Sequence, residues 1–222
     1  MAAILHYAAT VVHPDNDRGF ERFVTFLDAI VAIAITLLVL PLVELTADVD
    51  EYDSVNQLLR ENKSELWAFL LSFLVVSRFW FAQHDSVRHL VRYDQRAANL
   101  LMLWAVTIVF LPFPTALMAE AEDNATTKVL YIGTLIATML VLAVFEAYLR
   151  AHPELTDADP EHDLDPVVGI VNVLMLLLAL AITLATPATS YFPILLLLVA
   201  GPIANGWRRL RGRGDRRTSV GE

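Results

Sequence analysis

Long apolar runs separated by short polar loops dominate the chain. A helix of about 20 residues is needed to cross the hydrocarbon core of a bilayer, and the runs approach or exceed this length. They are continuous rather than alternating, which favours helices over the strands of a membrane barrel. The pattern therefore predicts an all-α integral membrane protein with six transmembrane helices, at residues 23–45, 66–82, 97–118, 128–149, 166–185 and 191–207.

Composition agrees with this pattern. Hydrophobic residues make up 56% of the 222 residues and charged residues only 18%, which is too apolar for an ordinary soluble domain. The chain has no cysteine, so disulfides and thiolate chemistry are excluded. The net charge of -9 comes from acidic loops, whereas the last segment is basic. This asymmetry indicates membrane topology rather than an acidic soluble protein.

Basic residues predict the orientation, because short cytoplasmic loops are enriched in lysine and arginine. Arg88, Arg92 and Arg96 follow the second run, and six arginines follow the sixth. Both termini are then expected in the cytoplasm. We divide the chain into a cytoplasmic segment (1–21), a six-helix domain (22–207) and a basic tail (208–222), which is expected to contact anionic lipid rather than nucleic acid.

Four ionisable residues lie within or at the ends of apolar runs, where a charge at the centre of a helix costs about 2.5–3.5 kcal/mol. Asp28 and Arg78 are at comparable depth. A buried network joining Asp28 to Arg78, Arg22 or His84, with the Trp80 indole as a further donor, would satisfy these groups. Such a network is equally compatible with helix packing alone. The fourth residue, Glu146, is expected at the membrane interface.

The first run also carries an apolar stripe. Ile33, Leu37 and Leu40 are spaced i, i+4, i+7 and share one helix face, with Thr36 close by. Around a symmetry axis this face would form stacked hydrophobic rings, which can gate a pore by dewetting. From periodicity alone, a packing face is the more common interpretation.

Other chemistries lack a basis in the sequence. The eight glycines form neither a phosphate-binding loop nor a glycine-containing carbonyl filter, so any ion selectivity must use side chains. His84 and His89 are five residues apart, which does not suit a zinc pair. No constellation of catalytic residues appears. We therefore expect no enzymatic activity, no metal site and no cofactor.

The first run carries a family resemblance. Residues 22–40 read RFVTFLDAIVAIAITLLVL, which resembles the signature helix of the transmembrane protein 175 family of potassium channels. Residues 79–84 (FWFAQH) and 111–117 (LPFPTAL) resemble the second and third helices of that family. One position departs from the signature, because Leu27 replaces the family serine between Phe26 and Asp28.

The resemblance implies a bacterial inner-membrane protein that assembles as a homotetramer around a central pore lined by the first helix. Potassium ions would be the permeant species. Ile33 would form the narrowest constriction, Leu37 and Leu40 further rings, and Thr36 a polar contact for the ion. The resemblance also implies a supporting interhelical network, made of Arg22, Phe26, Asp28, Arg78, Trp80 and His84.

Two alternative functions remain open from the sequence. In a proton-coupled secondary transporter, Asp28 and His84 would relay protons, and flux would saturate and follow a proton gradient. A non-conducting structural membrane protein would show no flux. A channel, in contrast, would pass current in proportion to the driving force.

Overall fold

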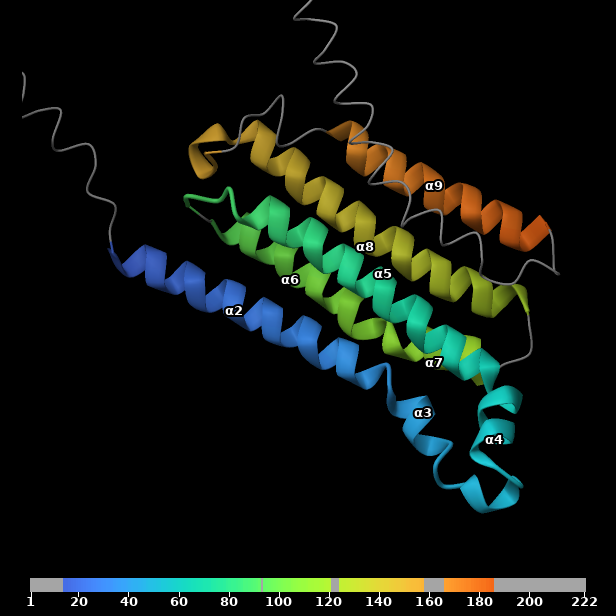
Figure 1. The fold of residues 1–222 in the computed structure, drawn as a ribbon. Coiled ribbons are helices and arrows are strands. Elements are labelled where there is room, and N and C mark those ends of the chain that lie inside the picture. The colour runs from blue at the N-terminus through green and yellow to red at the C-terminus, as the bar shows by residue number, and fades with distance from the viewer. Residues whose placement is uncertain (1–13, 93, 121–123, 158–165, 186–222) are drawn as a thin grey trace, which may run out of the picture.

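The computed structural model describes residues 14–92, 94–120, 124–157 and 166–185, and helices dominate this part of the chain (Figure 1). An isolated antiparallel bridge pairs Leu90 with Thr156. The prediction of an all-α fold is confirmed over these residues. The helices are α2 (Pro14–Leu37), α3 (Leu40–Glu44), η1 (Val49–Glu51), α4 (Val55–Glu61), α5 (Lys63–Val87), α6 (Gln95–Phe110), α7 (Pro112–Glu120), α8 (Ala125–Ala151), η2 (Pro153–Leu155) and α9 (Pro166–Ala185).

Four segments within the described residues are long and apolar enough to cross a membrane: Gly19–Glu51, Lys63–Val87, Gln95–Ala119 and Ala125–Ala151. They correspond to the first four predicted spans. Gly169–Ala185 is a shorter apolar helix at the position of the fifth. The sixth predicted span, 191–207, and the basic tail lie outside the described residues. The chain is thus a multi-pass membrane protein with at least four candidate spans.

The first span is interrupted close to Pro41. Helix α2 ends at Leu37, and α3 begins at Leu40 with Pro41 in its first turn. Proline has no N–H to donate to the carbonyl one turn earlier. The backbone tightens before it, because Leu38 N–H donates to Ile35 O and Val39 N–H to Thr36 O, both at 3.3 Å. The break therefore separates two helical segments within one span.

The third span is also divided, although the sequence predicts one helix over 97–118. Helix α6 ends at Phe110 and α7 begins at Pro112, with Leu111 N–H donating to Ile108 O at 3.1 Å between them. Pro112 and Pro114 each remove a backbone donor from this stretch, so the regular ladder cannot continue through it. The two helices remain one apolar segment.

The segment between the first two predicted spans contains a helix that hydrophobic periodicity does not reveal. Helix α4 begins after Ser54, whose side-chain oxygen accepts a hydrogen bond from Gln57 N–H at 3.3 Å. This is a serine N-cap, a local signal that the sequence contains. Leu58 is buried and anchors α4 to the rest of the protein.

The long helices lie side by side and form successive layers (Figure 1). Helix α2 packs against α5 and α6, α6 packs against α8, and α9 packs against α8. At the last contact, a Cβ added to Gly169 would lie 3.3 Å from Ala143 Cβ, so the two small residues allow α8 and α9 to approach closely. This order places α2 and α9 on opposite sides of the described bundle.

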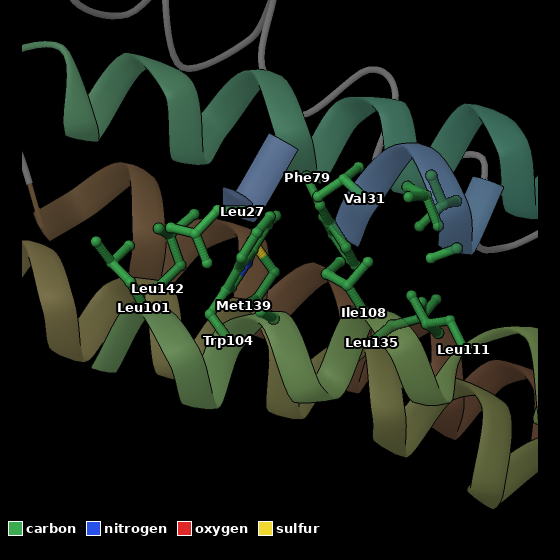
Figure 2. Packing of buried hydrophobic residues seen from close by; sticks show 14 of the residues in the cluster. Leu27, Val31, Phe79, Leu101, Trp104, Ile108, Leu111, Leu135, Met139 and Leu142 are labelled. Carbon is green, nitrogen blue, oxygen red and sulfur yellow. The ribbon is translucent and has the colours of Figure 1, made fainter. Parts of the chain in front are cut away.

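The core lies between α2, α5, α6 and α8. Figure 2 shows Leu27 and Val31 of α2 among Phe79 of α5, Trp104 of α6 and Met139 of α8. All five side chains are buried. Within a membrane, lipid is as apolar as this core, so close packing rather than escape from water stabilises the contact.

Candidate pore helix and its supporting contacts

Helix α2 has two distinct faces. Leu27, Val31, Ala34 and Leu38 are spaced i, i+4, i+7, i+11 and are buried against the bundle. The predicted stripe lies on other positions of the first span and is exposed. The exposed fractions are 59% for Ile33 and 39% for Leu37 on α2, and 49% for Leu40 at the start of α3. The stripe is therefore free to contact lipid or another copy of the chain.

Polar oxygens accompany this apolar stripe. Thr36 is exposed, and its hydroxyl donates to Ile33 O on the preceding turn at 2.8 Å. Thr25 is also exposed and donates to Glu21 O at 2.8 Å. Because each hydroxyl proton is engaged by the helix itself, the oxygen keeps its acceptor capacity for an outside partner. A cation is one such partner.

Asp28 and Trp80 are in direct contact. The Trp80 indole Nε1–H donates to Asp28 Oδ1 at 2.8 Å, and both side chains are half-buried. The Trp80 ring contacts the exposed His84 ring, with ring centroids 5.5 Å apart. This contact fixes α2 to α5 at the depth of Asp28. Phe26, from the same predicted network, is exposed beside the stripe.

Neither arginine of the predicted network forms an ion pair with Asp28 in the described residues of a single chain. Among the described residues, the ion pairs are Arg88 with Asp85 and His89 with Asp157, and Asp28 takes part in neither. Arg22 is exposed. Within one chain, the structure therefore joins Asp28, Trp80 and His84, and the part played by the two arginines stays a prediction.

Replacing Trp80 by phenylalanine tests the contact with Asp28. The substitution keeps an aromatic ring but removes the donor, which leaves a half-buried carboxyl group without its partner. A hydrogen bond to a charged group contributes about 1.5–3 kcal/mol, so Trp80→Phe should lower the free energy of unfolding in detergent by about that amount. Phe81→Leu, at the neighbouring exposed ring, is the matched control. An equal loss in both variants would assign the effect to aromatic packing alone.

Several side-chain contacts near the predicted cytoplasmic side were not predicted from the sequence. Asp94 caps α6, with Oδ1 accepting from Ala97 N–H at 2.8 Å and Oδ2 accepting from the Tyr148 hydroxyl at 2.6 Å. These donors, first the Tyr148 hydroxyl and then the Ala97 N–H, hold the pKa of Asp94 below its ordinary value. The capping role of Asp94 is a local signal, whereas its contact with α8 requires the fold.

Another such contact joins Ser86 of α5 to Glu146 of α8, at 2.7 Å between Ser86 Oγ and Glu146 Oε1. Glu146 is half-buried, and α9 passes beside it. The described residues contain no group of three or more histidine and acidic side chains that could hold a metal ion.

Taken together, the apolar helices and the outward stripe of α2 define a multi-pass membrane protein with an unpartnered face on its first helix. The profile of the family described as "Endosomal/lysosomal potassium channel TMEM175" matches residues 22–112. A potassium channel of Chamaesiphon minutus is 31% identical over 151 residues, which cover 66% of this chain and 74% of the relative. The chain belongs to the TMEM175 family, as residues 22–40 indicate.

Animal relatives are longer. The human "Endosomal/lysosomal proton channel TMEM175" is 26% identical over 223 aligned positions, which cover 93% of this chain and 44% of the human protein. For the Danio rerio protein of the same name, the match covers 27% of the relative. The chain thus spans less than half the length of these two relatives.

A solved structure shares the fold. It is the crystal structure of a lysosomal potassium-selective channel TMEM175 homolog from Chamaesiphon minutus, with a TM-score of 0.61 and 23% sequence identity. The superposition covers 85% of this chain and 99% of that one. The likeness extends well beyond the residues that the family profile matches.

Proposed function

We propose that four copies of this chain form a passive, potassium-selective channel, with α2 of each copy lining a central pore. The observation that carries the proposal is the exposed stripe of Ile33 and Leu37 on α2 and Leu40 at the start of α3, in a span whose other face is buried in the core. Membership of a family with bacterial potassium channels, from Chamaesiphon minutus and Streptomyces collinus, supports the same assignment.

Ile33 is proposed as the narrowest ring of this pore. An apolar ring requires an ion to give up water without full replacement, and it can gate by dewetting. Potassium loses its hydration shell at lower cost than sodium, so a hydrophobic constriction favours potassium to a modest degree. Leu37 and Leu40 extend the apolar path, and the Thr36 oxygen offsets part of the dehydration at the next level.

The proposed setting is the inner membrane of a bacterium, with both termini in the cytoplasm. The loop after α5 carries Arg88, Arg92 and Arg96, and residues 208–222 are also basic. Lysine and arginine in short loops favour the cytoplasmic side. The basic tail would then contact anionic lipid at the inner leaflet, which attracts such segments electrostatically. The proposal includes neither a cofactor nor enzymatic activity.

The test is ion flux through the purified chain in liposomes. Under a potassium gradient, we expect passive flux proportional to the driving force, and lower flux when sodium replaces potassium. Cross-linking or mass determination in detergent should give a tetramer. Empty liposomes prepared in the same way are the control.

Each alternative predicts a different result. Flux that saturates and follows an imposed proton gradient would favour a transporter that uses Asp28 and His84. Equal permeability to potassium and sodium would contradict selectivity but not conduction. Vesicles that contain the tetramer and pass neither ion would favour a structural role.

A further inference from the structure

Ser86 makes two short polar contacts at the seam between α5 and α8. Its Oγ lies 2.7 Å from Glu146 Oε1 on α8 and 3.0 Å from Ala82 O, one turn earlier on α5. Both distances are in the range of direct O–H···O hydrogen bonds. Ser86 is buried, so bulk water does not readily take the place of either partner.

The number of protons on Ser86 and Glu146 decides whether both of these contacts can be full hydrogen bonds. A serine hydroxyl carries one proton and can donate to one acceptor at full strength. A peptide carbonyl only accepts, and an ionised carboxylate also only accepts. If Glu146 were ionised, Ser86 would have to divide its one proton between two acceptors. If Glu146 is a neutral acid, its own O–H supplies the second proton and both contacts are hydrogen bonds.

A second observation concerns Gln83, which lies one turn before Ser86 on the same side of α5. Gln83 is 1% exposed, and its Nε2 has no hydrogen-bond partner among the described residues. A partly buried carboxylate needs several donors to offset its lost hydration. No hydrogen bond joins this amide to Glu146 among the described residues, and Ser86 is the side chain of α5 that reaches the acid.

Charged groups around Glu146 are few in the described chain. Arg78 of α5 forms no ion pair with Glu146 among the described residues. Arg150 follows one turn later on α8. Helix α9, whose Gly169 lies beside Glu146 Oε2, has no charged side chain between residues 169 and 185. Within the described residues, Glu146 therefore has no ion-pair partner and lies beside an apolar helix.

We propose that Glu146 is a proton-binding site in the protein at neutral pH. The carboxylic acid O–H donates to Ser86 Oγ, and the Ser86 hydroxyl donates to Ala82 O. The proton comes from water and returns to water when the acid ionises, which leaves Ser86 with one proton for two acceptors. This site is separate from the pore-lining stripe of α2 and does not depend on whether the protein conducts potassium.

Helix α5 connects the Glu146 site to the proposed pore helix α2. Ser86 lies on α5 less than two turns after Trp80, which donates to Asp28 of α2. Loss of the proton would weaken the contact of α5 with α8 while the contact of α5 with α2 remains. The bound proton thus stabilises one particular position of α5 between the two helices.

Infrared spectroscopy of the full chain in lipid tests the assignment directly, because neutral and ionised carboxyl groups absorb at different frequencies. At neutral pH, Glu146→Gln should remove one carboxylic acid C=O band from the spectrum of the native protein. Glu154→Gln is the matched control at an exposed glutamate of η2, and it should remove ionised carboxylate bands only. Loss of carboxylate bands in both variants, without loss of an acid band, would overturn the proposal.

A second variant covers the case in which Glu146→Gln does not fold. Ser86→Ala removes the acceptor of the acid proton, so the C=O band should shift to higher frequency while remaining an acid band. Ser86→Thr keeps the hydroxyl and should leave the band in place. An unchanged band in Ser86→Ala would contradict the hydrogen bond. Since no ion gradient is used, the outcome is independent of the potassium flux assay.

Discussion

Replacing Ile33 by asparagine should raise potassium flux and reduce the preference for potassium over sodium. The amide would offer polar contacts at the level where an apolar ring makes ions give up water. If the ring contributes about 1.4 kcal/mol to the barrier, flux would rise about tenfold. Ile33→Ala, which widens the ring but keeps it apolar, should give a smaller increase. Flux of both ions into liposomes measures the effect.

Ile170 provides a matched control for this experiment. It is the same residue type on α9, with an exposed fraction of 55% against 59% for Ile33. Ile170→Asn should leave ion selectivity unchanged, since α9 lies on the opposite side of the described bundle from α2. The pore assignment of Ile33 is contradicted if both asparagine variants behave alike, or if Ile33→Asn and the native protein conduct equally.

Leu27→Ala should have the largest effect on stability. Leu27 is fully buried in the core, and truncating a buried leucine to alanine typically costs about 2–5 kcal/mol, part of it from the cavity left behind. Chemical unfolding in detergent should therefore show a clear loss for Leu27→Ala. Because this residue faces the bundle, the ion selectivity of the protein that remains folded should stay close to native.

Leu37→Ala is the counterpart on the same helix. Its side chain is partly exposed in the single chain, so its truncation should affect conduction more than the stability of the fold. Comparing Leu27→Ala with Leu37→Ala distinguishes the role of the buried face of α2 from that of its exposed face. Equal destabilisation by both substitutions would mean that the outward face of α2 also contributes to packing, for instance between copies of the chain.

The sequence predicted the positions of the helices well, because the length of an apolar run is a strong and local signal. The runs at 66–82 and 128–149 correspond to α5 (Lys63–Val87) and α8 (Ala125–Ala151), which extend beyond the predictions at both ends. The extensions contain polar and charged residues that apolar length does not count. The break near Pro41 was also predictable, because proline removes a backbone donor wherever it lies.

Side-chain partners were less predictable, because they depend on how helices rotate about their axes. Asp28, Arg78 and Glu146 lie at helix positions that sequence can place only in depth. The structure gives Asp28 the Trp80 donor and places Ser86 of α5 against Glu146. Leu27, the departure from the family signature, occupies the apolar core, where a leucine side chain needs no polar partner.

The sequence by itself determined the class of protein, the depth of its helices and its family, because these depend on composition, periodicity and a local motif. Only the tertiary structure decided which face of α2 is buried, which donor reaches Asp28, and which side chain lies against Glu146. Those outcomes depend on contacts between residues that are more than 50 positions apart, as from Asp28 to Trp80 and from Ser86 to Glu146. Helix periodicity defines a stripe, but packing decides which way it faces.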